Sequence, residues 1–257
     1  MSDRLKIALV QPSLLWEDPQ SNLRRLEDFI QDVQETDLII LPEMFSTGFT
    51  MQPAKVNSAD LSKTLSWMDK MAQKHQCAIT GSTIVCEDGR YFNRLYFVNH
   101  EGNRWLYDKR HTFTLAGEDK VYTKGRNRTI IPYKGFRICP MICYDLRFPV
   151  WSRNSEDFDV LLYVANWPSA RVDAWDTLLR ARAIENMVYC IGVNRIGSDD
   201  NGLEYPGHSA VYDSLGNSLV FSEKEEIIYA ELHKEHLNST REKLKFLQDR
   251  DSFSLLP

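Results

Sequence analysis

Short apolar runs of strand length alternate with segments of helical period along most of this chain. The apolar runs are bounded by polar or turn-forming residues, whereas the longer segments repeat apolar residues every three or four positions. In the first third the expected strands are 5–11, 37–44 and 77–85, and the expected helices are 22–33 and 58–75. This order predicts an α/β protein, because the first two strand runs are each followed by a helix that can cover a sheet.

In the middle of the chain, apolar runs follow one another without helical segments between them. The turn signal "EDGR" precedes an apolar run that ends near Asn99, and "HEGN" separates this run from the next one, which begins near Arg104. Short runs joined by turns predict antiparallel strands. Further on, strands are expected at 136–143, 159–166 and 189–197, a helix at 173–187, a late hairpin from 208–216 and 218–232, and a polar helix at 234–248. So many strands favour two sheets with helices outside. We expect one domain over 1–257, with its core at about 4–232 and a C-terminal helix and tail at 233–257.

Charge and composition exclude several classes of function. The 257 residues carry a formal net charge of −5, whereas nucleic-acid and membrane-surface proteins usually present a clustered basic face. We therefore expect neither a nucleic-acid nor a membrane partner, and any anionic ligand must meet local positive charge. The start has no apolar stretch of signal-peptide type, and five cysteines lie mostly in apolar runs. A cytoplasmic protein without disulfides is expected.

Three residues of different chemistry stand at the ends of predicted strands. Glu43 follows "DLIILP", Lys109 follows "RWLYD", and Cys143 ends "FRICPMIC". Strand ends in α/β sheets are where side chains leave the packed layers and enter a crevice. Each residue alone has an ordinary interpretation, such as a core thiol or a solvated charge. Their shared position instead predicts one site.

The motifs around these three residues resemble those of the carbon-nitrogen hydrolase, or nitrilase, superfamily. The matching segments occur in the same order over residues 4 to 232, and are "LPEMFSTGF", "YDKRHTF", "ICYDLRFP", "ANWP", "RARAIEN", "GVNRIG" and "GHSAVYDSLG". The resemblance implies a four-layer α-β-β-α sandwich. It also implies pairing with a second copy, so we expect a homodimer.

The resemblance implies a covalent mechanism in which Cys143 is the nucleophile. A thiol attacks well only as thiolate, so Glu43 is expected to take its proton and later deliver it to ammonia. Lys109 and the backbone N–H of Tyr144 are expected to stabilise the oxyanion. The family has a second glutamate, and Glu118 is the only glutamate between Lys109 and Cys143 that matches it.

The residues after the cysteine point to a substrate class. "CYDLRFP" resembles the amidase branches that include the omega-amidases, which remove ammonia from 2-oxoglutaramate and 2-oxosuccinamate. Asp145 and Arg147 are expected to brace the turn after the nucleophile. Trp167 is a candidate wall of the acyl pocket. Arg171 is a candidate partner for a substrate carboxylate, or else a residue of the subunit interface. His208 is expected either to line the pocket or to have a plain loop role.

Several alternatives stay open. A broad aliphatic amidase or an N-carbamoyl hydrolase uses the same three residues, and a catalytically silent metabolite-binding scaffold has the same fold. A cysteine–histidine dyad would need His111 or His208 beside the nucleophile, but no cysteine-protease signature surrounds it. The cysteine and histidine spacings do not predict a metal site, and no phosphate-loop spacing occurs. We expect a small-molecule amide substrate and no cofactor.

Overall fold

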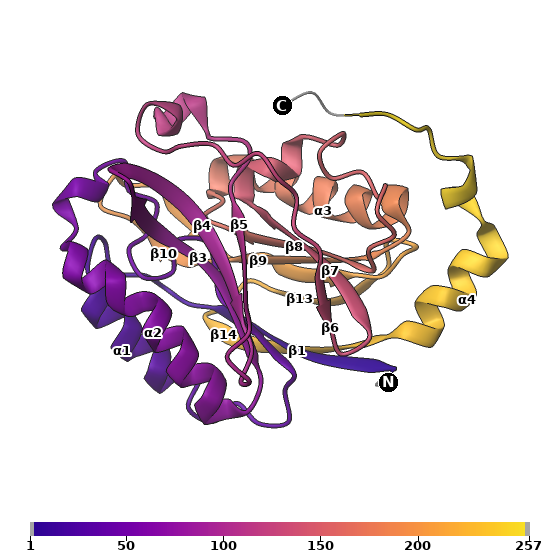
Figure 1. Ribbon diagram of the computed structural model, residues 1–257, viewed down its shortest axis with the longest axis horizontal. Coiled ribbons are helices and arrows are strands. Elements are labelled where there is room, and N and C mark those ends of the chain that lie inside the picture. Colours follow the sequence, from indigo (N-terminus) through magenta and orange to yellow (C-terminus); the bar gives the residue numbers. More distant parts are fainter. Residues whose placement is uncertain (1–2, 255–257) are drawn as a thin grey trace.

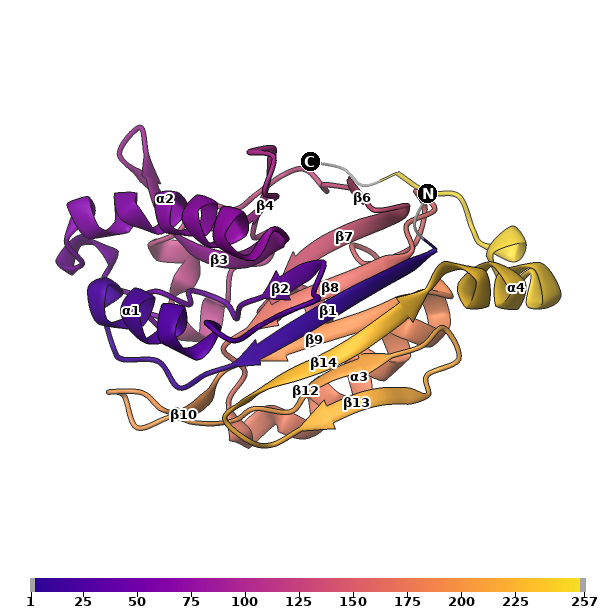
Figure 2. The same ribbon diagram turned by 90° about the horizontal axis from the view of Figure 1, so that it is seen from below.

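The computed structural model describes residues 3–254, and these residues form two six-stranded sheets that pack face to face (Figures 1 and 2). In order across the first sheet, the strands are β14 (Glu226–His233), β1 (Arg4–Gln11), β2 (Leu38–Ile40), β3 (Ala78–Glu87), β4 (Arg90–Val98) and β5 (Arg104–Asp108). In order across the second, they are β13 (Ser218–Ser222), β12 (Ser209–Tyr212), β9 (Tyr189–Asn194), β8 (Val160–Ala165), β7 (Phe136–Ile142) and β6 (Ile131–Tyr133).

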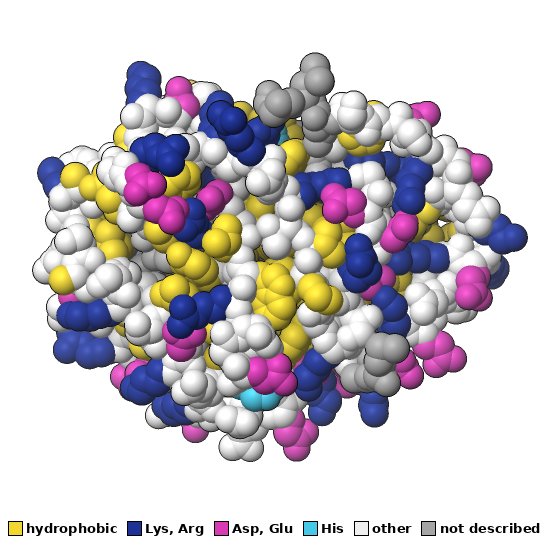
Figure 3. Space-filling model, in the orientation of Figure 1, with side chains coloured by type: hydrophobic (Ala, Val, Ile, Leu, Met, Phe, Trp, Pro, Cys, Tyr) yellow, Lys and Arg dark blue, Asp and Glu magenta, His cyan; other side chains and the backbone are white. Residues whose placement is uncertain are grey.

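Helices cover the outer face of each sheet. In Figure 2, α1 (Pro19–Phe29) and α2 (Ser58–His75) lie against the first sheet, and α3 (Val172–Asn186) lies against the second. The four-layer α-β-β-α sandwich expected from the resemblance is therefore confirmed. On the face shown in Figure 3, basic and acidic side chains are interspersed, and hydrophobic side chains gather near its centre.

Alternation along the strands explains why their sequences are almost continuously apolar. In β1, Ile7 and Leu9 point into the core between the sheets, whereas Ala8 and Val10 pack against the helices outside. Successive strand side chains face opposite sides, so a sheet buried on both faces needs apolar residues at every position. The same rule separates Ile40 of β2, which faces the other sheet, from Ile39, which faces the helices.

The expected late hairpin was only partly correct. Strands β12 and β13 do pair, but the expected second arm at 218–232 divides between the two sheets. Its second half, β14, pairs antiparallel with all of β1 in the first sheet. The side-chain amide of Gln11 donates to the carbonyls of Ser222 and Lys224. These bonds hold the segment that passes from β13 in the second sheet to β14 in the first. Pairing with β14 also removes an exposed edge from β1, which a local pattern does not reveal.

The strand expected at 189–197 also divides. After β9, the chain leaves the second sheet as β10 (Ile196–Ser198), which pairs with β11 (Glu204–Pro206) in a small hairpin. No helix in the described range 3–254 is long and apolar enough to cross a membrane.

The C-terminal helix α4 (Lys234–Leu244) is shorter than the expected 234–248 and is anchored by ion pairs. Only Leu237 of this helix is buried. Asp159, at the start of the β8 segment and 2% exposed, pairs with Lys234 and with Arg241 at 3.0 Å. One buried carboxylate therefore fixes the helix to the body of the protein.

Asp159→Ala should lower the free energy of unfolding by about 3 kcal/mol, because it leaves two partly buried cations without their partner. The exposed ion pair between Asp157 and Arg250 provides a matched control, and Asp157→Ala should cost under about 1 kcal/mol. Denaturant unfolding and limited proteolysis at α4 measure both effects. Equal effects of the two substitutions would contradict the anchoring role.

Candidate active site

The structure brings Glu43, Lys109 and Glu118 together in one buried cluster, and the partly exposed Cys143 lines the same cavity as Lys109. The Lys109 Nζ lies 2.8 Å from Glu43 Oε1, and 3.0 and 2.9 Å from the two carboxylate oxygens of Glu118. Cys143 follows β7, across the core from the strands that carry Glu43 and Lys109. The two glutamates are fully buried and the lysine is 1% exposed. Two carboxylates and one ammonium are thus held together away from water.

A sharp turn presents Cys143. The residue has φ of +45°, which a non-glycine residue rarely adopts, and it opens a short 3-10 helix over Cys143–Arg147. The buried Asp145 carboxylate accepts hydrogen bonds from the Ile142 N–H at 3.0 Å and the Tyr107 hydroxyl at 2.7 Å. It also accepts one from the His111 N–H at 2.9 Å. The expected brace by Asp145 is thus present in the structure.

Neither candidate histidine has a hydrogen bond or ion pair with Cys143 among the described residues; each pairs with an aspartate instead. The His111 Nδ1 is 2.8 Å from Asp145, and its ring stacks on Phe148 with centroids 3.7 Å apart. The His208 Nδ1 is 2.9 Å from Asp176. The cysteine–histidine dyad therefore has no counterpart among the described contacts.

Burial and charge control the protonation of the cluster. Burial raises the pKa of the Cys143 thiol well above its usual value, and the Glu43 charge raises it further, whereas Lys109 opposes both effects. Burial alone would lower the pKa of Lys109, but the charges of Glu118 and Glu43 outweigh burial and raise it. Burial raises the pKa of Glu118. At neutral pH the thiol is therefore protonated and needs a base, while the lysine stays charged.

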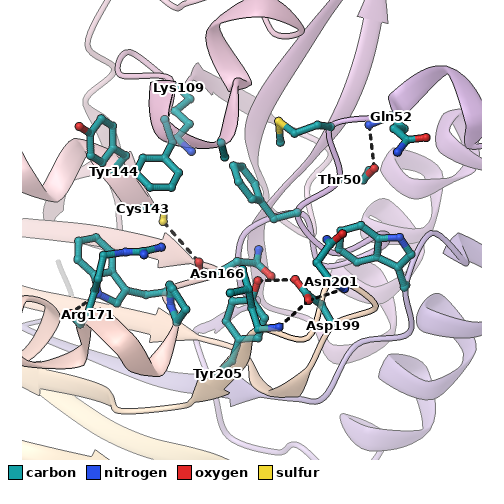
Figure 4. Close-up of a pocket in the computed structure, with 18 of the residues that line it drawn as sticks. Thr50, Gln52, Lys109, Cys143, Tyr144, Asn166, Arg171, Asp199, Asn201 and Tyr205 are labelled. Atoms are coloured by element: carbon teal, nitrogen blue, oxygen red, sulfur yellow. Dashed lines mark hydrogen bonds between the residues drawn. The ribbon is translucent and has the colours of Figure 1, made fainter.

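A cavity of about 300 Å³ opens over this cluster. Its wall is largely aromatic, and the side chains of Trp16, Phe49, Phe113, Tyr144 and Trp167 line it. In Figure 4, Lys109, Cys143, Tyr144 and Arg171 lie on one side of the pocket, and Asp199 and Asn201 of the β10–β11 hairpin lie on the other. Such a volume suits a small molecule.

Comparison with known proteins decides the family. The family model for carbon-nitrogen hydrolase matches residues 6–242. This chain belongs to the carbon-nitrogen hydrolase family. It is accordingly a hydrolase of carbon-nitrogen bonds.

Similar members of the family cover nearly the whole chain. The omega-amidase YafV of Yersinia enterocolitica is 43% identical, with 98% of this chain and 99% of that protein covered. A 2-oxoglutaramate amidase of Bacillus subtilis is 32% identical, with coverages of 95% and 96%. The crystal structure of XC1258 from Xanthomonas campestris, a superfamily protein with an arsenic adduct in its active site, has a TM-score of 0.92 and 40% identity, with 98% and 99% covered.

Two arginines supply positive charge to the cavity of this carbon-nitrogen hydrolase. Arg171 lines it as expected, with its Cζ 5.2 Å from the centroid of the Phe113 ring. Arg147, which was expected to brace the turn, instead lines the cavity with its Cζ 4.9 Å from the Trp167 ring. Within residues 3–254 neither guanidinium has a carboxylate at ion-pair distance. Both are thus available to an anion.

Of the other expected pocket residues, the structure places Trp167 in the cavity wall and leaves His208 outside it. The Trp167 indole is 3% exposed and donates to the Arg171 carbonyl at 2.7 Å. Of the two expectations for His208, the structure fits the loop role, because its ring contacts Asp176 and Glu223 and does not line the cavity. A loop position alone does not show on which side of a wall a side chain falls.

Two asparagines that the sequence analysis did not assign also contact Glu43. The Asn93 Nδ2 donates to Glu43 Oε1 at 2.8 Å, and the Asn166 N–H donates to Glu43 Oε2 at 2.8 Å. A polar residue within the apolar strand "YFNRLYF" was the available signal for Asn93. Metal ligation has no comparable arrangement, since no group of three or more His, Cys, Asp or Glu side chains in the described part of the chain is placed to hold an ion.

Proposed function

We propose that this protein hydrolyses the terminal amide of a small 2-oxo dicarboxylate monoamide, such as 2-oxoglutaramate or 2-oxosuccinamate, and releases ammonia. The observation that carries the proposal is the buried Glu43–Lys109–Glu118 cluster beside Cys143, at a cavity with two free guanidiniums. The similarity to an omega-amidase and to a 2-oxoglutaramate amidase supports the same substrate class.

In the acylation step, Glu43 takes the proton of the Cys143 thiol while the sulfur attacks the amide carbon. The oxyanion that forms is stabilised by the Lys109 ammonium and the Tyr144 N–H. When the tetrahedral intermediate collapses, the C–N bond breaks, and the proton on Glu43 passes to the nitrogen. Ammonia leaves and a thioester remains. The raised pKa of the Cys143 thiol supports the need for this base.

Hydrolysis of the thioester reverses these roles. Water enters the place of the ammonia, Glu43 takes one of its protons, and the oxygen attacks the thioester carbon. The C–S bond breaks, the proton returns to the sulfur, and the dicarboxylate leaves. Glu118 does not exchange protons in this scheme. It accepts two hydrogen bonds from Lys109 and one from the Phe113 N–H, and so holds the ammonium in place.

Substrate selection is assigned to the two guanidiniums and the aromatic wall. The protein is acidic overall, with a formal net charge of −5, so an anionic substrate needs local cations. Arg171 and Arg147 offer planar donors that match a carboxylate. Trp167 and Phe113 hold these side chains by cation–π contact. Glutamine is a poorer fit, because its ammonium would approach two positive groups.

We further propose that the chain acts as a cytoplasmic homodimer built from one domain over 1–257. All five cysteines are free thiols, which fits a reducing compartment. Pairing is supported by the resemblance to a family whose sandwiches commonly pair. Sedimentation or light scattering of the purified protein measures the assembly directly.

Cys143→Ala should lose more than about 100-fold of kcat/KM for ammonia release and stay folded, because it removes only the nucleophilic sulfur at the pocket edge. Cys139→Ala, in the preceding strand β7 and fully buried, is the matched control and should lower stability more than turnover. A Cys143→Ala protein that kept about a tenth of the activity would refute the thioester route.

Arg171→Met and Arg147→Met should each lower kcat/KM for 2-oxoglutaramate by about 10- to 150-fold. This is the loss expected when one hydrogen bond between charged groups is removed. An uncharged aliphatic amide of similar length should be affected much less. The assay is ammonia release from 2-oxoglutaramate, glutamine, an N-carbamoyl amino acid and the aliphatic amide. Best turnover of the aliphatic or carbamoyl compound would favour a broad amidase or an N-carbamoyl hydrolase instead. Equal losses on all substrates would make the arginines structural.

A further inference from the structure

One buried amide contacts both glutamates of the cluster and has no part in the scheme above. Asn93 lies in β4 and is 1% exposed. Its Nδ2 donates to Glu43 Oε1 at 2.8 Å and lies 3.4 Å from Glu118 Oε1. Its backbone carbonyl accepts the Lys109 N–H at 3.0 Å. Asn93 therefore joins the strand that carries the lysine to both carboxylates.

The chemistry of the cluster determines which way the Asn93 amide faces. A rotated amide would place Oδ1, which only accepts, against two carboxylates that also only accept. In the observed orientation the Nδ2 faces the carboxylates, and Oδ1 is buried with no partner among the described residues. A buried acceptor without a partner is costly. The observed orientation therefore keeps a neutral donor between the two carboxylates.

The hydrogen bonds to Glu43 leave little room for a proton. A carboxylate offers about four acceptor positions, shared between its two oxygens. The two acceptor positions on Oε1 are occupied by hydrogen bonds from the Lys109 Nζ and the Asn93 Nδ2. On Oε2, one is taken by the Asn166 N–H. The position that remains is on Oε2, the oxygen held by the Asn166 N–H, and the carbonyl of the same Asn166 lies 3.9 Å from the Cys143 Sγ.

We propose that Asn93 is a positioning residue that confines the proton on Glu43 to Oε2. The inference rests on the proposed function. In this proposal the proton taken from Cys143 lies on Oε2, the oxygen that accepts the Asn166 N–H, and it passes from there to the departing nitrogen. Without Asn93, Oε1 accepts only from Lys109, so the proton also occupies Oε1 and is turned away from the nitrogen. Asn93 acts through Glu43 and touches no substrate.

The experiment compares an amide with an activated ester of the same acyl group. The amide nitrogen leaves as ammonia only after it receives a proton. The p-nitrophenolate of the ester leaves without receiving one. Asn93→Leu removes the donor at similar volume, and should lower kcat/KM for the amide by about 10- to 100-fold. The ester should lose less than about threefold, since thiol activation by Glu43 is retained. A fall in the amide-to-ester ratio is therefore the predicted signature.

Asn99→Leu is the matched control. Asn99 follows the same strand, is 6% exposed, and accepts the Asn103 N–H at 2.8 Å away from the site. This variant should leave the amide-to-ester ratio at the wild-type value. If Asn93→Leu does not fold, as judged by circular dichroism, Asn93→Ser is measured instead, under the same criterion. Equal losses on amide and ester, or an unchanged amide rate, overturns the inference.

Two reference measurements separate this inference from the proposed function. Wild type must release ammonia from an omega-amide, and Glu43→Gln must lose both amide and ester hydrolysis. If either reference fails, the proposed function is wrong. If both hold and the amide-to-ester ratio of the Asn93 variant does not fall, the proposed function stands and only the role of Asn93 is rejected.

Discussion

The site depends on the ion pairs of Lys109 with Glu43 and Glu118. Two buried carboxylates repel each other strongly at low dielectric, and a single buried charge would be neutralised instead. The Lys109 ammonium lies within 3.0 Å of each glutamate. It therefore offsets the repulsion between the carboxylates, and it provides each buried charge with a partner of opposite sign. The charge of Glu43 also raises the pKa of the nearby Cys143 thiol.

The sandwich explains how such a cluster is held. Glu43 follows β2 and Lys109 follows β5 in one sheet, and Cys143 follows β7 in the other. The backbone N–H of Asn166, at the end of β8, donates to Glu43 and so joins the two sheets at the site. Packing between the sheets therefore sets the distance between Glu43 and Cys143, the proposed base and nucleophile. Rigid strands position reacting groups more exactly than mobile loops do.

The turn at Cys143 stores strain that the surroundings balance. A positive φ at a cysteine costs free energy, and such conformations persist only where neighbouring contacts enforce them. The buried Asp145 provides that enforcement, because it accepts from Ile142, Tyr107 and His111 at once. His111 belongs to this support through its contacts with Asp145 and Phe148. The brace and the proposed proton transfer thus use separate sets of residues.

The sequence by itself determined the α/β class, the motifs around Glu43, Lys109 and Cys143, and their expected meeting, because strand period and strand ends are local properties. The tertiary structure alone decided which far-apart groups share a site. It brought the Asn93 amide into a hydrogen bond with Glu43 and placed the Arg147 side chain in the cavity wall. It also paired β14 with β1 in the first sheet. These outcomes follow from long-range packing, which brings together residues far apart along the chain. A local pattern shows what a side chain can do, and only its neighbours in space determine what it does.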